Sequence, residues 1–285
     1  MESVTGPTST GPTSTGPKTI GPKSTGKVYL LGAGPGDPGL MTLKGKTLLE
    51  SADVVIYDAL VSDPILAMIG PQAQRIHAGK RRGRHSLKQA ETTQLMLELA
   101  QTHAVIVRLK GGDPYVFGRG GEEAGDLINA GIPVEVIPGI TSGIAAAAYA
   151  GIPLTHRGYS SSVTFVTGHE AAGKYRPDVN WQAIAQGSET IVIYMGVHNL
   201  PTIISDLCDS GGGLSLETPI ALIRWGTRPD QAELVGTLET IVQQVEETGF
   251  EAPAIAVIGA VVGLKAQLAH CQPEPLPQPH PKAVS

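Results

Sequence analysis

Four short segments of the chain carry carboxyl or hydroxyl residues, three of them together with glycine, in a pattern that could hold a small molecule. They lie at residues 32–37 (GAGPGD), 57–62 (YDALVS), 111–114 (GGDP) and 138–142 (PGITS). Glycine lets the backbone approach a ligand closely, and a carboxylate accepts hydrogen bonds from hydroxyl or ammonium groups. These segments are therefore candidates for a binding site, although the hydroxyl groups at 141–142 could also simply cap a helix.

The segment at 32–37 is similar to the glycine-rich fingerprint of dinucleotide-binding proteins, and Asp58 follows Gly36 by 22 positions, near the place of a ribose-binding acid. However, the third glycine comes one residue early, and Pro35 removes a backbone N–H that a pyrophosphate would need. A ligand without phosphates fits this loop better, while a plain tight turn and NAD binding stay open. Asp58 is either a turn or cap residue or a functional carboxylate.

Residues 80–84 (KRRGR) place four cations in five positions of a chain whose net charge is −5. A solvated loop, a nucleic-acid patch and a site for a polyanionic small molecule are the alternatives. Aromatic residues make up only 4% of the chain and none interleaves with these cations, which disfavours stacking on bases. Arginine pairs with carboxylates through two parallel hydrogen bonds, so a polyanionic small molecule is favoured. The candidate carboxylate-binding residues are Arg81, Arg82, Arg84, His85, His156 and Arg157.

Several common kinds of catalytic site have no counterpart in the sequence. It contains neither GxSxG nor a phosphate-binding P-loop, and no cluster of His, Cys, Asp and Glu has the spacing of metal ligands, so we expect no metal. Two cysteines are too few for a disulfide framework. Catalysis should therefore depend on the positioning of two bound molecules and not on a covalent nucleophile.

The candidate segments follow apolar runs, and each run leads through its loop into a helical pattern. In the first half we expect strands at 28–31, 53–57, 74–78, 104–109 and 134–137, with helices at 42–51, 86–100, 122–130 and 144–150. Alternating strands and helices predict a parallel, doubly wound α/β sheet. In such sheets ligands bind outside the carboxyl ends of the strands, where these glycine segments lie.

The second half has a different pattern, in which two strands follow each other directly. We expect strands at 163–167, 190–194, 219–224, 233–238 and 254–262, with helices near 199–209, 239–248 and 263–270. This predicts a mixed sheet, and therefore a second α/β domain. The predicted domains are 27–143 and 144–268, with the boundary near residue 143.

The two ends of the chain account for much of its 36 glycines and 22 prolines. Residues 1–26 include a five-residue repeat of the GPTST type and predict a flexible, disordered leader, whereas 269–285 form a proline-rich tail. Neither a secretory signal nor a membrane span of ~20 apolar residues is present. With 41% hydrophobic and 16% charged residues, the remainder predicts a soluble, cytoplasmic globular protein.

Taken together, the motifs resemble the tetrapyrrole methylase family, and within it the members that methylate uroporphyrinogen III. The resemblance covers about residues 27–268. The motifs that carry it are VYLLGAGPGDPGLMTLKG, VVIYDALVSDPIL, GKRRGRHS, VRLKGGDPYVFGRGGEE, VIPGITSGIAAAAYAGIPLTHRGYSSSVTFVTGH and IVIYMG. It implies a two-domain homodimer that binds S-adenosylmethionine between its domains. It also implies methylation of rings A and B, giving precorrin-2 for sirohaem or cobalamin synthesis.

The resemblance also implies roles for individual residues. The family's proposed proton acceptor and donor match Asp58 and Lys80. Arg224-Trp225, before Gly226, depart from the smaller or polar residues often found there. The cofactor contacts match Pro35, Gly111, Gly112, Asp113, Val116, Thr141, Ser142, Met195 and Gly226.

Two kinds of alternative remain after the resemblance. One is another family member, acting on a later corrin precursor, on diphthine or on ribosomal RNA; the motifs GKRRGRHS and GIPLTHR disfavour it. The other is an RNA- or anion-binding module that uses the basic loop without turnover. Some homologues also carry dehydrogenase and ferrochelatase activities, but the 26 residues before the core predict methyltransferase activity alone.

Overall fold

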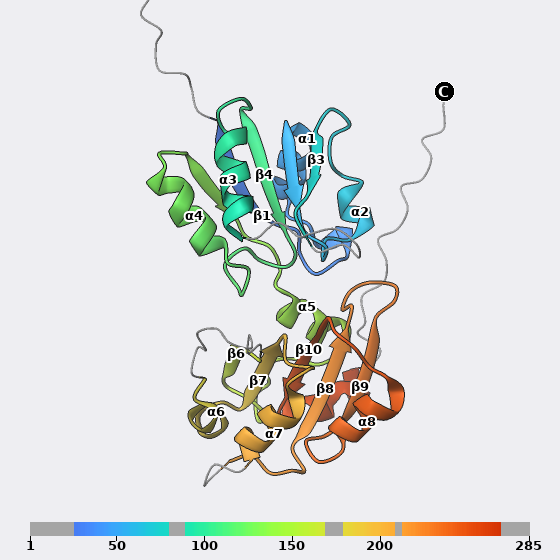
Figure 1. Ribbon diagram of the computed structural model, residues 1–285. Helices are drawn as coiled ribbons and strands as arrows, with labels where there is room; N and C mark the ends of the chain where they lie inside the picture. The colour runs from blue at the N-terminus through green and yellow to red at the C-terminus, as the bar shows by residue number, and fades with distance from the viewer. Residues whose placement is uncertain (1–25, 80–88, 169–178, 209–212, 269–285) are drawn as a thin grey trace, which may run out of the picture.

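The computed structural model describes residues 26–79, 89–168, 179–208 and 213–268, which form two α/β halves with a sheet in each (Figure 1). The N-terminal half holds a five-stranded parallel sheet in the order β3-β2-β4-β1-β5. Its strands are β1 (Lys27–Gly32), β2 (Val54–Tyr57), β3 (Gln74–His77), β4 (Val105–Lys110) and β5 (Val134–Ile137). The predicted parallel sheet is confirmed.

Helices cover both faces of this sheet, because successive side chains of a strand point to opposite faces. On one face Leu49 and Val55 belong to a buried apolar cluster, whereas Ile56 and Met96 belong to the cluster on the other face. The helices of the two faces are α1 (Leu43–Ser51) and α2 (Asp63–Leu66) on the first, and α3 (Gln89–Leu99) and α4 (Gly120–Asn129) on the second. The sheet is therefore doubly wound, as predicted.

The strand order places a switch point at the centre of the sheet. Strands β1 and β4 are neighbours, but the chain leaves β1 toward β2 on one side and leaves β4 toward β5 on the other. The helices that follow these two strands therefore lie on opposite faces of the sheet, α1 after β1 on one face and α4 after β4 on the other. Open α/β sheets bind ligands at this position.

The C-terminal half holds a five-stranded mixed sheet in the order β6-β7-β10-β8-β9, in which only β6 and β7 are parallel. This confirms the predicted mixed sheet. Its strands are β6 (Val163–Thr167), β7 (Thr190–Tyr194), β8 (Pro219–Arg224), β9 (Ala232–Thr237) and β10 (Ala254–Ile258). Because β10 is antiparallel to β7 and β8, its first residues lie at the same edge as the last residues of those two strands.

Helices also cover both faces of the second sheet. One face carries α6 (Trp181–Gly187), α7 (Leu200–Cys208) and α8 (Ile241–Thr248), whose apolar residues join one buried cluster. The other face carries α5 (Ser142–Tyr149), with Ala146 and Ala147 packed against Val192 and Val257. Helix α5 lies between the two halves in sequence and in space (Figure 1).

The predicted elements differ from the observed ones in a few places. Strand β10 ends at Ile258, and residues predicted to extend it form the 3-10 helix η2 (Ala260–Leu264), followed by α9 (Lys265–Leu268). Gly259, with φ of 137°, ends the strand because that backbone conformation favours glycine. The short helices α2, α6 and η1 (Pro38–Leu40) were not predicted, because turns this short carry almost no periodic signal.

Several predictions concern parts of the chain outside the described residues. These are nearly all of the leader, the whole proline-rich tail at 269–285, and the beginning of the helix expected from residue 86. The predicted boundary at 143 falls inside α5 and stays a prediction. In the part of the chain that the structure describes, no helix is both long and apolar enough to cross a bilayer.

Candidate active site

A cavity of about 580 Å³ is lined by residues from both halves of the protein. From the N-terminal half come the loops after β1, β2, β4 and β5, and from the C-terminal half come the loops after β7 and β8 and the start of β10. All nine residues that the sequence assigned to the cofactor line this cavity, and so does Asp58. The structure therefore brings together residues that lie up to 191 positions apart, from Pro35 to Gly226.

Backbone contacts between glycines hold the N-terminal wall together. Gly34 and Gly112 exchange two hydrogen bonds, of 3.1 Å from Gly34 N and 2.8 Å from Gly112 N. A Cβ atom on Gly139 would lie 2.2 Å from the carbonyl oxygen of Gly112, a distance that no side chain tolerates. The loops after β1, β4 and β5 thus pack backbone against backbone, which explains the glycines in three of the four predicted segments.

The carboxylate of Asp113 fixes the shape of the loop after β4. Its Oδ1 atom accepts hydrogen bonds from the backbone of Tyr115 (2.8 Å) and Val116 (3.2 Å), and its Oδ2 atom accepts one from Gly139 (3.0 Å). Asp113 therefore joins two loops of the cavity wall. The direct cofactor contact that the family resemblance implies for it stays a prediction.

Asp58 lies at the end of β2, half-buried at the cavity wall. Its Oδ1 atom accepts a hydrogen bond of 3.0 Å from the backbone of Leu60, a local turn that holds the side chain in place. Within the described part of the chain, no hydrogen bond is made by its Oδ2 atom. The carboxylate is thus oriented by one oxygen while the other can receive a proton.

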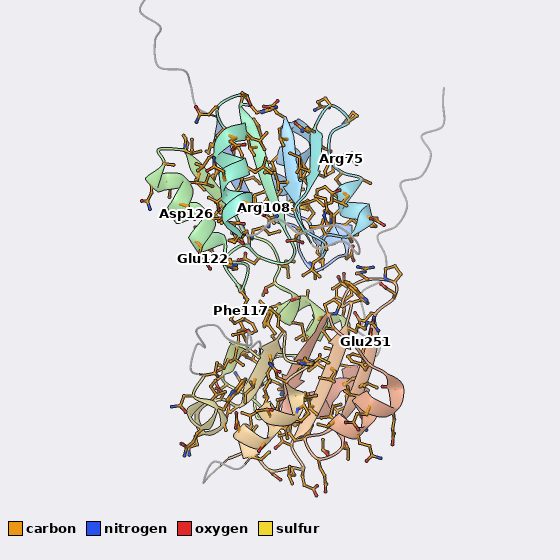
Figure 2. The ribbon with its side chains drawn as sticks, in the orientation of Figure 1. Arg75, Arg108, Phe117, Glu122, Asp126 and Glu251 are labelled. Atoms are coloured by element: carbon orange, nitrogen blue, oxygen red, sulfur yellow. The ribbon has the colours of Figure 1, made fainter. Side chains whose placement is uncertain are left out.

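A buried ionic cluster lies beside Asp58 on β4 and α4. Glu123 is fully buried and accepts hydrogen bonds from Arg108 Nε (3.2 Å), Lys110 Nζ (2.9 Å) and Gln89 Nε2 (2.8 Å). Figure 2 shows Arg108 in the N-terminal half, and both cations also line the cavity. A buried carboxylate needs such partners, because an unpaired buried charge is costly.

Burial and neighbouring charges both shift the pKa values of this cluster. Burial alone would raise the pKa of Glu123, but the charges of Arg108 and Lys110 and the hydrogen bonds from Lys110 and Gln89 outweigh it and lower that pKa. Burial lowers the pKa of Lys110, and the neighbouring charge of Arg108 adds to the effect. Since Asp58 acts electrostatically on Lys110, the cluster extends to the candidate proton acceptor.

Strained backbone marks the same cavity. Positive φ angles are uncommon for residues with a Cβ atom and tend to occur at functional sites. Among the described residues, five non-glycine residues have positive φ, and four of them line the cavity. The four are Phe117 (53°), Arg119 (58°), Met195 (55°) and Trp225 (49°), and the fifth is Thr227 (72°), next to Gly226. A concentration of such residues at one cavity is typical of a functional site.

Tyr194 joins the two halves at the base of the cavity. Its hydroxyl group lies 2.7 Å from Thr141 Oγ1 and accepts a hydrogen bond of 2.9 Å from Gly143 N. Its ring packs against Phe117, which lies between the halves in Figure 2, with 4.8 Å between centroids. Burial raises the pKa of Tyr194, outweighing its hydrogen bond with Thr141. The hydroxyl therefore stays protonated and holds the start of α5 against β7.

Not every predicted residue belongs to this arrangement. His156 and Arg157 are exposed in the turn before β6, closed by a hydrogen bond of 3.0 Å from His156 N to Ser160 O, and they do not line the cavity. The basic residues Lys80, Arg81, Arg82, Arg84 and His85 lie outside the described residues. Their predicted contacts with substrate carboxylates stay predictions.

Sequence reasoning missed several cavity residues. The missed residues include Arg108, Lys110, Phe117, Arg119, Tyr194 and Ile255. Charged residues inside an otherwise apolar strand (VIVRLK) were a usable signal, because a buried charge needs a partner or a function. Tyr194 and Ile255 carry no such signal, since apolar and aromatic residues are ordinary in strands.

Comparison with known proteins agrees with this geometry. Residues 27–242 match the sequence profile of the family described as Tetrapyrrole (Corrin/Porphyrin) Methylases. The chain belongs to this family. That match covers the whole first sheet and every strand of the second except β10, and therefore most of the loops that form the cavity.

Two curated tetrapyrrole methylases show how similar the chain is to characterised members. A uroporphyrinogen-III C-methyltransferase from Synechocystis is 70% identical over 243 residues, which are 85% of this chain and 92% of the relative. One from Priestia megaterium is 51% identical over 83% of this chain and 98% of the relative. Siroheme synthases such as that of Hahella chejuensis match at 49% identity, and there the matched region is only 51% of the relative.

A solved tetrapyrrole methylase has the same fold. The uroporphyrin-III C-methyltransferase of Thermus thermophilus, crystallised with S-adenyl homocysteine, is 38% identical, with a TM-score of 0.70. The superposition covers 84% of this chain and all of that one. The predicted two-part α/β fold of the family is therefore confirmed.

Proposed function

We propose that the protein transfers methyl groups from S-adenosylmethionine to uroporphyrinogen III, on ring A and then on ring B, and so forms precorrin-2. The observation that carries the proposal is the single cavity lined by residues of both halves. It contains every residue that the family resemblance assigns to the cofactor, and Asp58 lies in its wall. The curated relatives that align over most of the chain carry the same activity in their names.

The described residues fit a nucleoside sulfonium better than a nucleotide. Pro35 removes a backbone donor from the first glycine loop, and the cavity lining is mainly apolar side chains and glycine backbone. Its volume of about 580 Å³ lies within the range of ~300–1,000 Å³ usual for small-molecule sites. Pro35, Gly111 and Gly112 would hold the cofactor on the N-terminal side, with Met195 and Gly226 on the other. When bound, S-adenosylmethionine supplies an electrophilic methyl group.

Asp58 is the residue that we propose as proton acceptor. Methylation of an electron-rich pyrrole carbon leaves the macrocycle with a proton to lose, and the Oδ2 atom of Asp58 is placed to take it. The hydrogen bond from Leu60 N to Oδ1 keeps the side chain directed along the cavity wall. A positioned acid or base of this kind contributes ~10²–10⁴-fold to a rate.

Cations would bind the carboxylates of the substrate. Arg119 lines the cavity and is paired with Glu122 in a bidentate contact, so its guanidinium group is held at the cavity mouth. We propose that the basic segment at 80–85 and the turn at 156–157 add further carboxylate contacts, with Lys80 as the proton donor. We also propose that the protein is a cytoplasmic homodimer and that its product feeds sirohaem or cobalamin synthesis.

Methyl incorporation tests this function directly. The protein is incubated without oxygen with uroporphyrinogen III and S-adenosylmethionine that carries a labelled methyl group, and the tetrapyrrole product is analysed by mass spectrometry. We expect two labelled methyl groups per macrocycle. Incorporation of none would overturn the proposal, and methylation only of a later corrin precursor, of diphthine or of RNA would assign the chain to another activity of the family.

A further inference from the structure

Two loops from different halves of the protein are joined directly beside the cavity. The first follows β1 and contains Pro35, and the second follows β8 and contains Gly226. Both residues line the cavity, on opposite halves. The side chains that join the loops are those of Asp37, Tyr149 and Thr227, which we call the Asp37 latch. None of these three residues lines the cavity itself.

Asp37 is the centre of the latch. Its Oδ2 atom accepts a hydrogen bond of 2.6 Å from the hydroxyl group of Tyr149 on α5, and its backbone N–H donates one of 3.1 Å to Thr227 Oγ1. Its Oδ1 atom accepts a hydrogen bond of 2.6 Å from Gly39 N and so caps η1. One residue of the N-terminal half is therefore tied to two separate elements of the C-terminal half.

The partner loop has little freedom to move independently. Thr227 has a φ of 72°, and its N–H donates a hydrogen bond of 2.7 Å to Gln231 Oε1. A Cβ atom on Gly226 would lie 2.4 Å from that of Ala146, so this loop is packed directly on α5. Tyr149 is on the same helix, so both partners of Asp37 are connected to α5: Tyr149 directly, and Thr227 through the loop that packs on Ala146.

The first loop is held just as closely. The hydroxyl group of Ser62 donates a hydrogen bond of 2.7 Å to the carbonyl oxygen of Gly36 and is buried. On the other side of Gly36, the side chain of Arg228 occupies the space that a Cβ atom would need. A shift of Asp37 would therefore also move the neighbouring Pro35.

The hydroxyl group of Tyr149 remains a hydrogen-bond donor to Asp37 over the whole physiological pH range. Burial, and then the hydrogen bond to Asp37, raise the pKa of Tyr149 to about 12, so the phenol keeps its proton and remains a donor. A hydrogen bond to an ionised carboxylate is stronger than one between neutral groups.

We propose that Tyr149 and Thr227 are positioning residues that act through Asp37 to set the distance between the two cofactor-binding walls at Pro35 and Gly226. This inference rests on the proposed function, since it assumes that S-adenosylmethionine spans both walls. It assigns no contact with the ligand to the latch. Loss of the Asp37 latch should therefore weaken binding of the cofactor and leave binding of the tetrapyrrole unchanged.

The test is calorimetric titration of Tyr149→Phe and Thr227→Val with S-adenosylhomocysteine. Each change removes one arm of the latch and little volume. We expect the Kd for S-adenosylhomocysteine to rise about tenfold for Tyr149→Phe, because the hydrogen bond that is lost is charge-assisted and therefore stronger than one between neutral groups. We expect a rise of about fivefold for Thr227→Val, whose hydrogen bond joins neutral groups. Thr227→Ser keeps the hydroxyl group and should restore most of the affinity. The KM for uroporphyrinogen III should stay within twofold of wild type.

Tyr29→Phe is the matched control, because it makes the same chemical change on β1, outside the cavity lining. A Kd within twofold of wild type for both Tyr149→Phe and Thr227→Val would overturn the latch. An equal weakening of both ligands would also overturn it, since that indicates general loosening of the fold. Failure of the wild-type protein to bind S-adenosylhomocysteine would instead overturn the proposed function.

Discussion

The two halves differ in which ends of their strands contribute residues to the cavity. In the N-terminal half every strand is parallel, so the cavity residues come from loops that follow strands β1, β2, β4 and β5. In the C-terminal half, loops that follow β7 and β8 meet the beginning of β10, because β10 is antiparallel to both. The rule that ligands bind at the carboxyl ends of strands therefore predicts one wall completely and the other only in part.

The halves also differ in where they bury charge. Among the described residues, the buried charged side chains are Arg108, Lys110 and Glu123, all in the N-terminal half. The buried polar residues of the C-terminal half are hydroxyl residues, such as Ser160 and Thr190. The charge buried at the site therefore comes from the first half, which also holds Asp58, the proposed proton acceptor. The described residues that the second half contributes to the cavity are mainly apolar.

Asp58→Asn tests the first half's chemical role and has the largest expected effect. Removing the proton acceptor should lower the single-turnover rate of methyl transfer by ~100-fold or more. Asparagine keeps an oxygen for the hydrogen bond from Leu60, so the Kd for S-adenosylhomocysteine should stay within twofold. Asp126→Asn, on α4 away from the cavity (Figure 2), is the matched control. A wild-type rate across pH in Asp58→Asn would exclude Asp58 as a base.

Sequence reasoning predicted more of the N-terminal wall of the cavity than of the C-terminal wall. Glycine segments after apolar runs predicted the N-terminal wall, because a turn at a strand end and a close backbone approach both require glycine, as at Gly112 and Gly139. The C-terminal wall was predicted only at Met195 and Gly226, through the family resemblance. Ile255 could not be found, because its place at the cavity depends on the pairing of β10 with β7 and β8 and not on any local pattern.

Roles that depend on tertiary contacts were also beyond the sequence. Asp37 looked like part of a glycine loop, and nothing near it in the chain indicates that Tyr149, 112 positions away, donates to its carboxylate. Similarly, nothing near Asp113 in the chain indicates that its carboxylate accepts a hydrogen bond from Gly139 N, 26 positions away. Residue type predicts the capacity to form hydrogen bonds, but the fold selects the partner.

Glu123→Gln tests whether the ionic cluster is essential to the first half. The change leaves two buried cations without their counter-charge, and breaking a buried pair typically costs ~3–5 kcal/mol. Urea unfolding should show this loss of free energy. The lowered pKa of Glu123 means that its stabilising contribution in the wild type is present above the unfolded-state pKa and is lost as pH falls through the lower folded-state value.

Glu50→Gln is the control for that experiment. Glu50 forms an exposed ion pair with Lys46 one helical turn away, and such pairs contribute only ~0.3–0.5 kcal/mol. A loss of less than ~1 kcal/mol for Glu123→Gln would contradict the account, because it would mean that the cluster is not the buried counter-charge that the geometry describes.

Two glycine substitutions separate close packing from helix propensity. Gly139→Ala places a Cβ atom 2.2 Å from Gly112 O and should destabilise the protein by ~2 kcal/mol or more, with weaker binding of S-adenosylhomocysteine. Gly125→Ala lies in α4 with nothing within 4 Å of the added atom, and should stabilise by ~0.5–1 kcal/mol. Equal effects of the two changes in thermal unfolding would contradict the proposed packing of the three loops.

The smallest effect concerns the pH dependence of the contact between the halves. The folded protein holds the Tyr149 proton up to a pKa of about 12, above the ordinary value of 10.0. The folded state therefore binds more protons than the unfolded state in this interval, so this contribution is complete below pH 10 and is lost as pH rises through 12. The difference in unfolding free energy between wild type and Tyr149→Phe should shrink across that interval. A constant difference would show that the phenol makes no such contact.

A crystal structure with S-adenosylhomocysteine tests the central claim that both halves build one cofactor site. The account predicts ligand density in the cavity, in contact with Pro35 and Gly112 on the N-terminal side and with Gly226 on the C-terminal side. Asp58 should lie beside the ligand's sulfur, facing the space left for the tetrapyrrole. Density that contacts only one half, or that lies outside this cavity, would contradict it.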